Sequence, residues 1–185
     1  TPKTGLKEIN LPKACGGLGV GCLGSNGFLT NVVLPEGLQD ISEGCFYNCP
    51  NITTIDMPST VKKISDGAFS KCSKLTDIKI FKTHTNYVSG KEFGFNLPDV
   101  VEEIGVSAFA ECMKFTSITI NSAKTNEKPN GIYLQSIGAS AFAGCENITS
   151  LTIPFIGKSV GGRKTDSATG KYIGSKETCL GWVFG

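Results

Sequence analysis

Apolar and polar positions alternate along the chain in short blocks that recur almost unchanged. The clearest copies are SDGAFSKCSKLTDIKI at 65–80, GVSAFAECMKFTSITI at 105–120 and GASAFAGCENITSLTI at 138–153. Each block ends in an alternating apolar and polar run, which predicts a short strand with one buried face. The preceding A-F-x-x-C is too short for a full helix and predicts a tight turn. A second extended piece, V-x-x-I, follows the strand, as at 61–64.

The period of this repeat is 23 residues. Phenylalanines, cysteines and aliphatic residues form three ladders, each with successive spacings of 23, 40 and 33. The ladders are Phe46, Phe69, Phe109 and Phe142; Cys49, Cys72, Cys112 and Cys145; and Ile55, Ile78, Ile118 and Leu151. The two longer spacings place 17 additional residues at 81–97 and 10 at 121–130.

A repeat of this kind predicts a β-rich solenoid. One coil of about 23 residues cannot bury its own apolar face, whereas stacked coils with strands about 4.8 Å apart can. We therefore expect short strands and tight turns in a stack of about five or six coils, with the phenylalanines inside and loop insertions at one edge. The solenoid should occupy 1–154, with degenerate coils at 1–28. Residues 155–185 should form a loop and a capping strand that covers the last coil.

The repeat also resembles a known family. The phrase IGASAFAGCENITSLTIP at 137–154 is similar to the BspA-like leucine-rich repeat, and the resemblance covers 29–154. The end of the chain resembles segments that follow such repeats in large bacterial surface proteins. The resemblance implies a leucine-rich-repeat fold, an extracellular or cell-surface location, and a place in a larger modular chain. It carries over no catalytic motif and no cofactor.

Charge and hydropathy exclude two classes of partner. The 18 basic residues nearly balance the 16 acidic ones and leave a net charge of +2. The chain therefore lacks the excess of positive charge that is typical of nucleic-acid binding. The sequence contains no run of 18 apolar residues, so we expect no membrane insertion in this segment.

The eight cysteines and the single His84 are the candidates for a reactive or metal-binding group. Four cysteines occupy the ladder and are expected to act as small buried hydrophobes. There is no C-x-x-C pair, and one histidine cannot complete a Cys2His2 set, so we predict no metal site. A Cys–His or Ser–His mechanism would have to use His84, and nothing around it resembles a nucleophile elbow. We therefore predict that the protein is not an enzyme and has no cofactor.

The remaining cysteines, Cys15, Cys22, Cys45 and Cys179, are less constrained by the repeat. Cys22 and Cys45 are one period apart and should lie on adjacent coils, near enough for a bridge if the geometry allows. Two N-I-T sequons, at Asn51 and Asn147, fall at the same repeat position. We interpret them as part of the repeat pattern rather than as glycosylation sites.

The insertions are the first candidate for a ligand-binding site. Both follow the alternating strand, and after the last strand the chain leaves the repeat at the same point into a basic stretch at 157–176. Repeat proteins place such insertions on one face, often the binding face. The predicted composite patch consists of Phe81, His84, Tyr87, Phe93, Phe95, Lys158, Arg163, Lys164 and Lys171. The alternative is that the aromatic residues of 81–97 fold back over the solenoid.

The outward side chains of the strands are the second candidate site. This concave strand face is small and polar, and the set consists of Thr54, Asp56, Asp77, Lys79, Ser117 and Thr119. With either site, we expect a non-catalytic binding or adhesion module that recognises a protein of a host or neighbouring cell. A glycan-binding module and a structural spacer with no ligand of its own are the alternatives.

Overall fold

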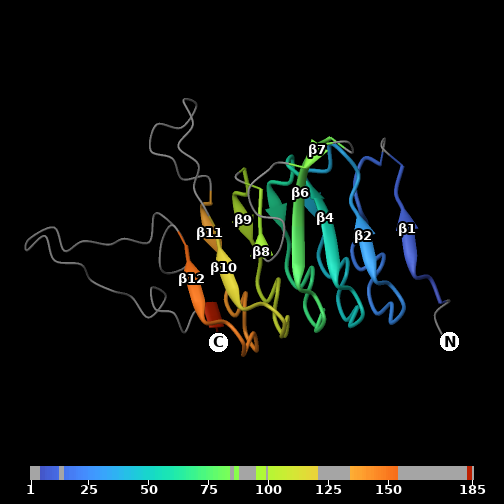
Figure 1. The fold of residues 1–185 in the computed structure, drawn as a ribbon. Coiled ribbons are helices and arrows are strands. Elements are labelled where there is room, and N and C mark those ends of the chain that lie inside the picture. Colours follow the sequence, from blue (N-terminus) through green and yellow to red (C-terminus); the bar gives the residue numbers. More distant parts are fainter. Residues whose placement is uncertain are drawn as a thin grey trace, which may run out of the picture.

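The computed structural model describes residues 5–12, 15–83, 86–87, 95–98, 100–120, 134–153 and 183–184. Within these residues the strands are β1 (Glu8–Asn10), β2 (Asn31–Val33), β3 (Asp40–Ile41), β4 (Thr54–Pro58), β5 (Lys63–Ile64), β6 (Asp77–Thr83), β7 (Asn86–Tyr87), β8 (Phe95–Asn96), β9 (Glu103–Ile104), β10 (Ser117–Thr119), β11 (Ser136–Ile137) and β12 (Ser150–Thr152). They follow one another along a single axis, from β1 at one end to β12 at the other (Figure 1).

The strands form parallel sheets on two sides of the stack. One side carries the sheet β1-β2-β4-β6-β7 and, beyond it, the sheet β12-β10-β8; the other side carries β11-β9-β5-β3. Strands of successive coils pair in register at the repeat period, so that Glu8 lies opposite Asn31, Asn31 opposite Thr54 and Thr54 opposite Asp77. β7 is antiparallel to β6. This arrangement confirms the predicted β-rich solenoid and its 23-residue coil.

The phenylalanine ladder forms the centre of the core. Phe46, Phe69, Phe109 and Phe142 are fully buried. Successive rings have centroids 5.3, 5.3 and 5.6 Å apart and are inclined by only 1°, 12° and 5°. The ladder cysteines line the same interior, where the thiols of Cys72, Cys112 and Cys145 donate to carbonyl oxygens of Phe46, Phe69 and Phe109. The predicted inward orientation of both ladders is confirmed.

The tight turns also stack, through backbone hydrogen bonds between coils. The Phe46, Phe69 and Phe109 amides donate to the carbonyls of Ala68, Ala108 and Ala141 in the next coil. The Phe142 amide continues the series by donating to the Val183 carbonyl, at 2.9 Å. Val183 is fully buried and the Phe184 ring lies 6.4 Å from that of Phe142. Val183 and Phe184 thus replace the Ala-Phe pair of a further coil. Their backbone is helical, and the rest of the predicted capping segment at 155–185 lies outside the described residues.

The first insertion contributes a strand to the solenoid, which corrects the expectation that 81–97 lies outside the repeat. β6 continues into the insertion and pairs with β7, after which β8 pairs in parallel with β10, with Phe95 opposite Ile118. β8 contacts β6 on its other side (Figure 1). On the opposite side of the stack β5 pairs directly with β9. The side that carries β6 and β10 therefore has an additional strand, β8, between these two coils, whereas the side that carries β5 and β9 has none.

The glycines at the start of two coils are required by close approach of the backbone. A Cβ atom on Gly138 would lie 2.3 Å from the Val106 nitrogen, and one on Gly105 would lie 2.5 Å from the Asp66 nitrogen. Real Cβ atoms do not come this close to a backbone atom, so the adjacent coil would have to move. The absence of a Cβ atom at the Gly of the phrase I-G-x-x-A-F therefore allows the backbones of successive coils to lie in contact.

We predict that Phe109→Ala lowers the free energy of unfolding by about 3–5 kcal/mol, because it leaves a cavity between two stacked rings. Denaturant unfolding measures the loss. The matched control is Tyr47→Ala, at an aromatic side chain that is 40% exposed, which should cost less than about 1 kcal/mol. A loss for Phe109→Ala as small as that of the control would contradict the inward ladder.

We predict that Gly138→Ala costs about 1–3 kcal/mol of stability through overpacking between coils. Gly27→Ala is the control, because a Cβ there would meet no atom within 4 Å. Its unfolding midpoint should stay the same or rise slightly. Equal changes in stability for the two substitutions would contradict the close backbone contact at Gly138.

Candidate functional site

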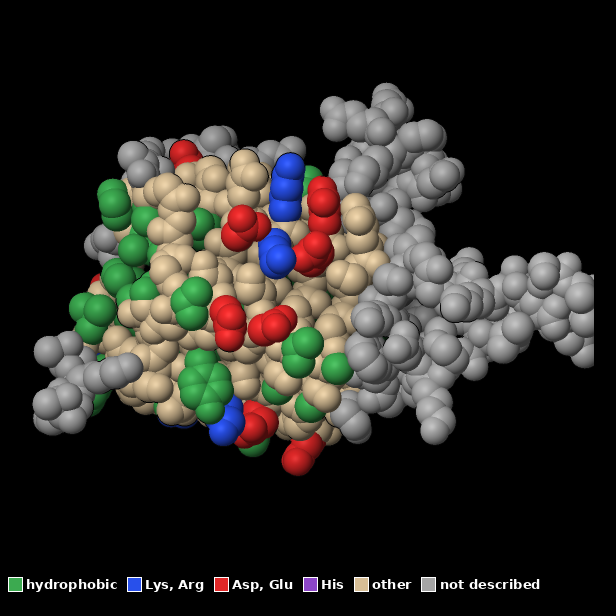
Figure 2. Space-filling view, turned by 180° about the vertical axis from the view of Figure 1, so that it is seen from behind, with side chains coloured by type: hydrophobic (Ala, Val, Ile, Leu, Met, Phe, Trp, Pro, Cys, Tyr) green, Lys and Arg blue, Asp and Glu red, His purple; other side chains and the backbone are tan. Residues whose placement is uncertain are grey.

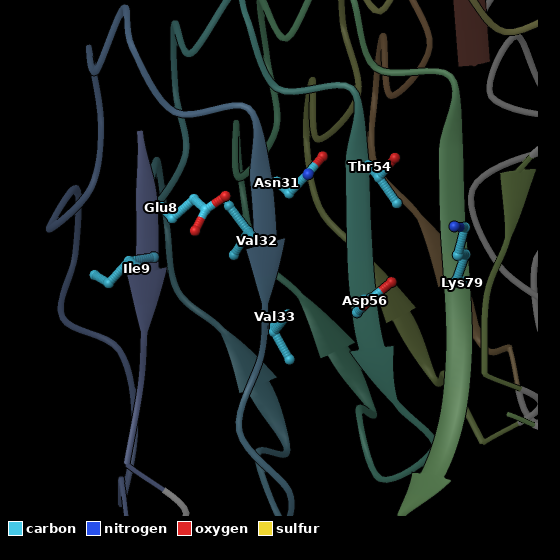
Figure 3. A pocket seen from close by; sticks show the side chains of 8 residues that line it. All are labelled: Glu8, Ile9, Asn31, Val32, Val33, Thr54, Asp56 and Lys79. Atoms are coloured by element: carbon cyan, nitrogen blue, oxygen red, sulfur yellow. The ribbon is translucent and has the colours of Figure 1, made fainter. Parts of the chain in front are cut away.

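A shallow hollow of about 290 Å³ lies on the outer surface of the sheet formed by β1, β2, β4 and β6 (Figure 3). It is lined by Glu8, Ile9, Asn31, Val32, Val33, Thr54, Asp56 and Lys79. The lining residues come from four successive coils. No single coil forms the hollow, which exists only because the coils are stacked.

The side chains around the hollow are arranged in two rows by the strand register. Glu8, Asn31, Thr54 and Asp77 are successive partners in one row, and Asn10, Val33, Asp56 and Lys79 are successive partners in the other. Alternate side chains of a strand point to opposite faces, so the described side chains of these rows lie on the outer face while Val32, Ile55 and Ile78 are buried. The buried ladder and the exposed rows thus share the same strands. We call the two rows the strand face.

The strand face is rich in oxygen acceptors. Glu8, Asp56 and Asp77 provide three carboxylates, against one ammonium group from Lys79. Thr76 Oγ1 donates to Asp77 Oδ2 at 2.7 Å, which orients that carboxylate. Thr53 Oγ1 lies 3.3 Å from Asn31 Oδ1. This arrangement can accept hydrogen bonds from a flat ligand that carries cationic or hydroxyl groups.

The structure brings together part of the strand-face set predicted from the sequence. Thr54, Asp56 and Lys79 line the hollow, and Asp77 is in the row next to it. Ser117 and Thr119 lie on β10, in the other sheet and beyond β8. Glu8, Asn31 and Val33 line the hollow but are missing from the predicted set, although the 23-residue register places them in the same rows. That any of these residues binds a ligand stays a prediction.

One residue of the predicted composite patch is in the core. Phe95 is 3% exposed, and its ring lies edge-on to those of Phe109, Phe115 and Phe142 at 5.0, 5.0 and 5.5 Å. The Phe95 side chain therefore belongs to the core rather than to the predicted patch. Phe81 and Tyr87 are opposite each other in β6 and β7. Other members, His84, Phe93, Lys158, Arg163, Lys164 and Lys171, lie outside the described residues, as does 121–130.

The opposite side of the stack carries charges that pair with each other (Figure 2). Lys63 Nζ lies 2.9 Å from Glu103 Oε2, and Lys71 Nζ lies 3.9 Å from Glu111 Oε1. These side chains are about half exposed, so each pair contributes little to stability. Lys71 also lies 5.7 Å above the Tyr47 ring.

The ladder thiols are not activated nucleophiles. Burial raises the pKa of Cys72 and of Cys112 well above the ordinary range, and it raises the pKa of Cys145 to about 11. A reactive cysteine needs a lowered pKa and access to solvent. Within the described part of the chain, no three His, Cys, Asp or Glu residues are placed to hold a metal ion.

The two sequon asparagines are hydrogen-bonded to the preceding coil. Asn51 Nδ2 donates to the Gly27 carbonyl and Asn147 Nδ2 donates to the Met113 carbonyl, both at 2.6 Å. A glycan attached to either amide nitrogen would interfere with this bond. The interpretation of the asparagines as repeat residues agrees with these contacts.

Comparison with known proteins supports the repeat assignment. A family model described as "BspA type Leucine rich repeat region" matches six copies, over residues 2–94, 91–155 and 129–163. A leucine-rich repeat protein from Bacteroides ovatus is 26% identical, with a TM-score of 0.61 over 80% of this chain. The chain spans only 33% of that protein's structure. A comparison with curated protein sequences finds no match.

A second solved structure is similar in fold. The leucine-rich repeat protein of T. pallidum is 19% identical, with a TM-score of 0.55 over 80% of this chain and 70% of its own. At this identity the likeness concerns the fold alone. No helix among the described residues has the length and apolar character needed to span a bilayer.

We predict that Cys72, Cys112 and Cys145 resist alkylation by iodoacetamide in the native protein and react fully after unfolding, because all three are buried. The labelling is done on the reduced protein, in which Cys22, which is exposed, is the internal control and should react much faster than the ladder thiols. Peptide mass spectrometry after timed labelling gives the rate at each site. Labelling of the three ladder thiols as fast as Cys22 would contradict their burial.

Proposed function

Because the chain belongs to the BspA-type leucine-rich repeat family, we propose that it is a non-catalytic binding module of a secreted or surface-attached bacterial protein. Its partner would be a protein of a host or neighbouring cell, held against the strand face. The observation that carries this proposal is the hollow lined by four successive coils, with acidic and polar side chains at fixed positions.

The rigidity of the strand face favours binding. Backbone ladders and the core beneath hold the strands in place, as Val32 and Ile55 are buried between the rows. Side chains such as Asn31, Thr54 and Asp56 are short and lose little rotamer entropy when they contact a partner. Binding to a preformed surface therefore costs less conformational entropy, because fewer side chains have to be ordered.

The charges of the strand face indicate the kind of partner. Glu8 and Asp56 lie around the hollow with Lys79, and Asp77 adds a carboxylate to the neighbouring row. A protein surface that presents Lys or Arg would complement the carboxylates, while Asn31 and Thr54 offer neutral hydrogen bonds. Complementary charge raises the association rate, and salt reduces this effect.

The same groups could hydrogen-bond to sugar hydroxyls, which keeps glycan binding as the second candidate. Carboxylate, amide and hydroxyl side chains all lie around the hollow. The two partners differ in their response to salt: binding of a basic protein should weaken as ionic strength rises, and binding of a neutral glycan should change little.

We predict that the double variant Glu8→Gln and Asp56→Asn weakens binding by roughly tenfold, equivalent to about 1.4 kcal/mol, because it removes two charges with little change of shape. The ligand is first found on an array of immobilised extracellular-matrix proteins and glycans, and the affinities are measured by surface plasmon resonance. Glu103→Gln, on the opposite side of the stack, is the matched control and should leave the affinity unchanged.

Variants of the composite patch test the competing site. Phe93→Ala combined with Lys158→Ala and Arg163→Ala should leave binding unchanged if the strand face is the site. Loss of binding in this variant alone would move the site to the insertions. If neither variant changes the affinity, or if no ligand is found, the proposed binding function of the strand face is wrong and a spacer role gains support.

A further inference from the structure

Two cysteines depart from the repeat pattern at positions that are stacked on each other. In the later coils the residue before the ladder phenylalanine is alanine, at Ala68, Ala108 and Ala141. In the first full coil this residue is Cys45, and one period earlier the degenerate coil has Cys22. Alanine is sufficient to fill the interior space at this position in the later coils. The packing of the repeat therefore does not explain why both of these coils have cysteine there.

The backbones at the two positions are in register. The turn at 21–25 stacks on the turn at 43–47 through hydrogen bonds from the amides of Gly21, Leu23 and Ser25 to the carbonyls of Glu43, Cys45 and Tyr47. Strands in such a stack lie about 4.8 Å apart, within the range of about 4.4–6.8 Å between the Cα atoms of a disulfide. Because the two turns are hydrogen-bonded in the same register, we expect a similar separation of their Cα atoms, which would allow a bridge.

The sulfur atoms themselves are in contact. Cys22 Sγ lies 3.6 Å from Cys45 Sγ. To form a bond of about 2.0 Å the sulfurs must approach by roughly 1.5 Å, which is within reach of small rotations about the side-chain bonds. The ladder thiols differ, since those of Cys49, Cys72, Cys112 and Cys145 lie against backbone carbonyls of another coil at 3.2–3.3 Å.

We propose that Cys22 and Cys45 form a redox-dependent disulfide that fastens the degenerate N-terminal coil to the first full coil. The oxidant is an external disulfide, such as oxidised glutathione or a dithiol–disulfide oxidoreductase. Two protein thiols lose two electrons and two protons and become one disulfide, while the external disulfide gains them and becomes two thiols.

The exposure of the two thiols sets the order of steps. Cys22 is exposed and meets the oxidant first, so its thiolate attacks the external disulfide, forms a mixed disulfide and releases one thiolate. Cys45 is buried next to it and then attacks the Cys22 sulfur, which releases the second thiol and leaves the internal bridge. Burial, together with the neighbouring Cys22, raises the pKa of Cys45 well above its ordinary value, which makes it a poor first attacker.

The degenerate coil is the part of the described solenoid that would gain most from a covalent tie. The stretch 13–27 contains Gly16, Gly17, Gly19, Gly21, Gly24 and Gly27. Glycine loses more backbone entropy on folding than other residues. In the same stretch Leu18 is buried but Val20 is 74% exposed, so apolar anchoring is sparse. A bridge that closes a 23-residue loop would offset part of this cost in the unfolded chain.

The test compares the full chain reduced with dithiothreitol and the same protein oxidised with glutathione disulfide under native conditions. Free thiols are alkylated in denaturant, and the protein is cleaved after basic residues and after Glu36 and Glu43. We expect a cross-linked pair of peptides, 14–36 and 44–62, whose fragmentation places the bridge at Cys22 and Cys45. Its mass should be about 2 Da below the summed mass of the two peptides alkylated only at Cys15 and Cys49, because Cys22 and Cys45 each lose one hydrogen.

The melting temperature gives the second readout. Oxidation should raise Tm by about 5–10 °C, the shift expected for a loop of this length in a protein of this size. Cys22→Ala and Cys45→Ala should abolish both the cross-link and the shift, and both should fold because alanine is the residue of the later coils at this position. Cys15→Ala is the control and should retain both.

Three outcomes would overturn the proposal. In the first, glutathione stays on Cys22 and Cys45 is still alkylated in denaturant. In the second, the cross-link connects Cys15 or Cys49 rather than the proposed pair. In the third, the bridge forms at Cys22 and Cys45 but the oxidised protein melts at the same temperature as the reduced one.

Discussion

Every other feature of this protein depends on the stacking of one coil on the next in a 23-residue register. A single coil has too few residues to enclose a core, and its strands contain only two to seven residues. Parallel ladders on two sides, together with the hydrogen bonds between turns, hold the coils so closely that a Cβ atom on Gly138 would collide with Val106. Stability is therefore expected to be a sum over neighbouring coils rather than the property of one central core.

This stacking separates structural from functional residues within each strand. Because side chains alternate, Val32, Ile55 and Ile78 are held in the core, while Asn31, Thr54 and Asp77 stand in a row outside it. The outward residues can vary without disturbing the core, and neighbouring coils bring them close together. The acidic hollow is a product of this geometry, as is the contact between Cys22 and Cys45 in the glycine-rich N-terminal coils.

The regular part of the fold could be predicted from the sequence because it repeats. Phe46, Phe69 and Phe109 share one spacing pattern with the cysteines, and only a stack places all of them in equivalent surroundings. Phe95 could not be predicted in the same way, because it has no counterpart at the repeat period. Its burial depends on the room that an additional strand between β6 and β10 creates, and local alternation in 81–97 does not reveal that room. Glu8 and Asn31 could be predicted only in part. The 23-residue register places them in a row of outward side chains, but it does not predict the hollow that they line.

Hydrogen exchange resolved to single amides tests the coil-by-coil account most directly. The account predicts that the amides of Phe69 and Phe109, which donate between full coils, exchange most slowly, and that Leu23 in the reduced degenerate coil exchanges at least about tenfold faster. Protection should decrease from the inner coils towards the N-terminal one. Equal protection of all three amides would contradict the account, since it would mean that the described solenoid opens as a single unit and that its stability does not arise from successive coil contacts.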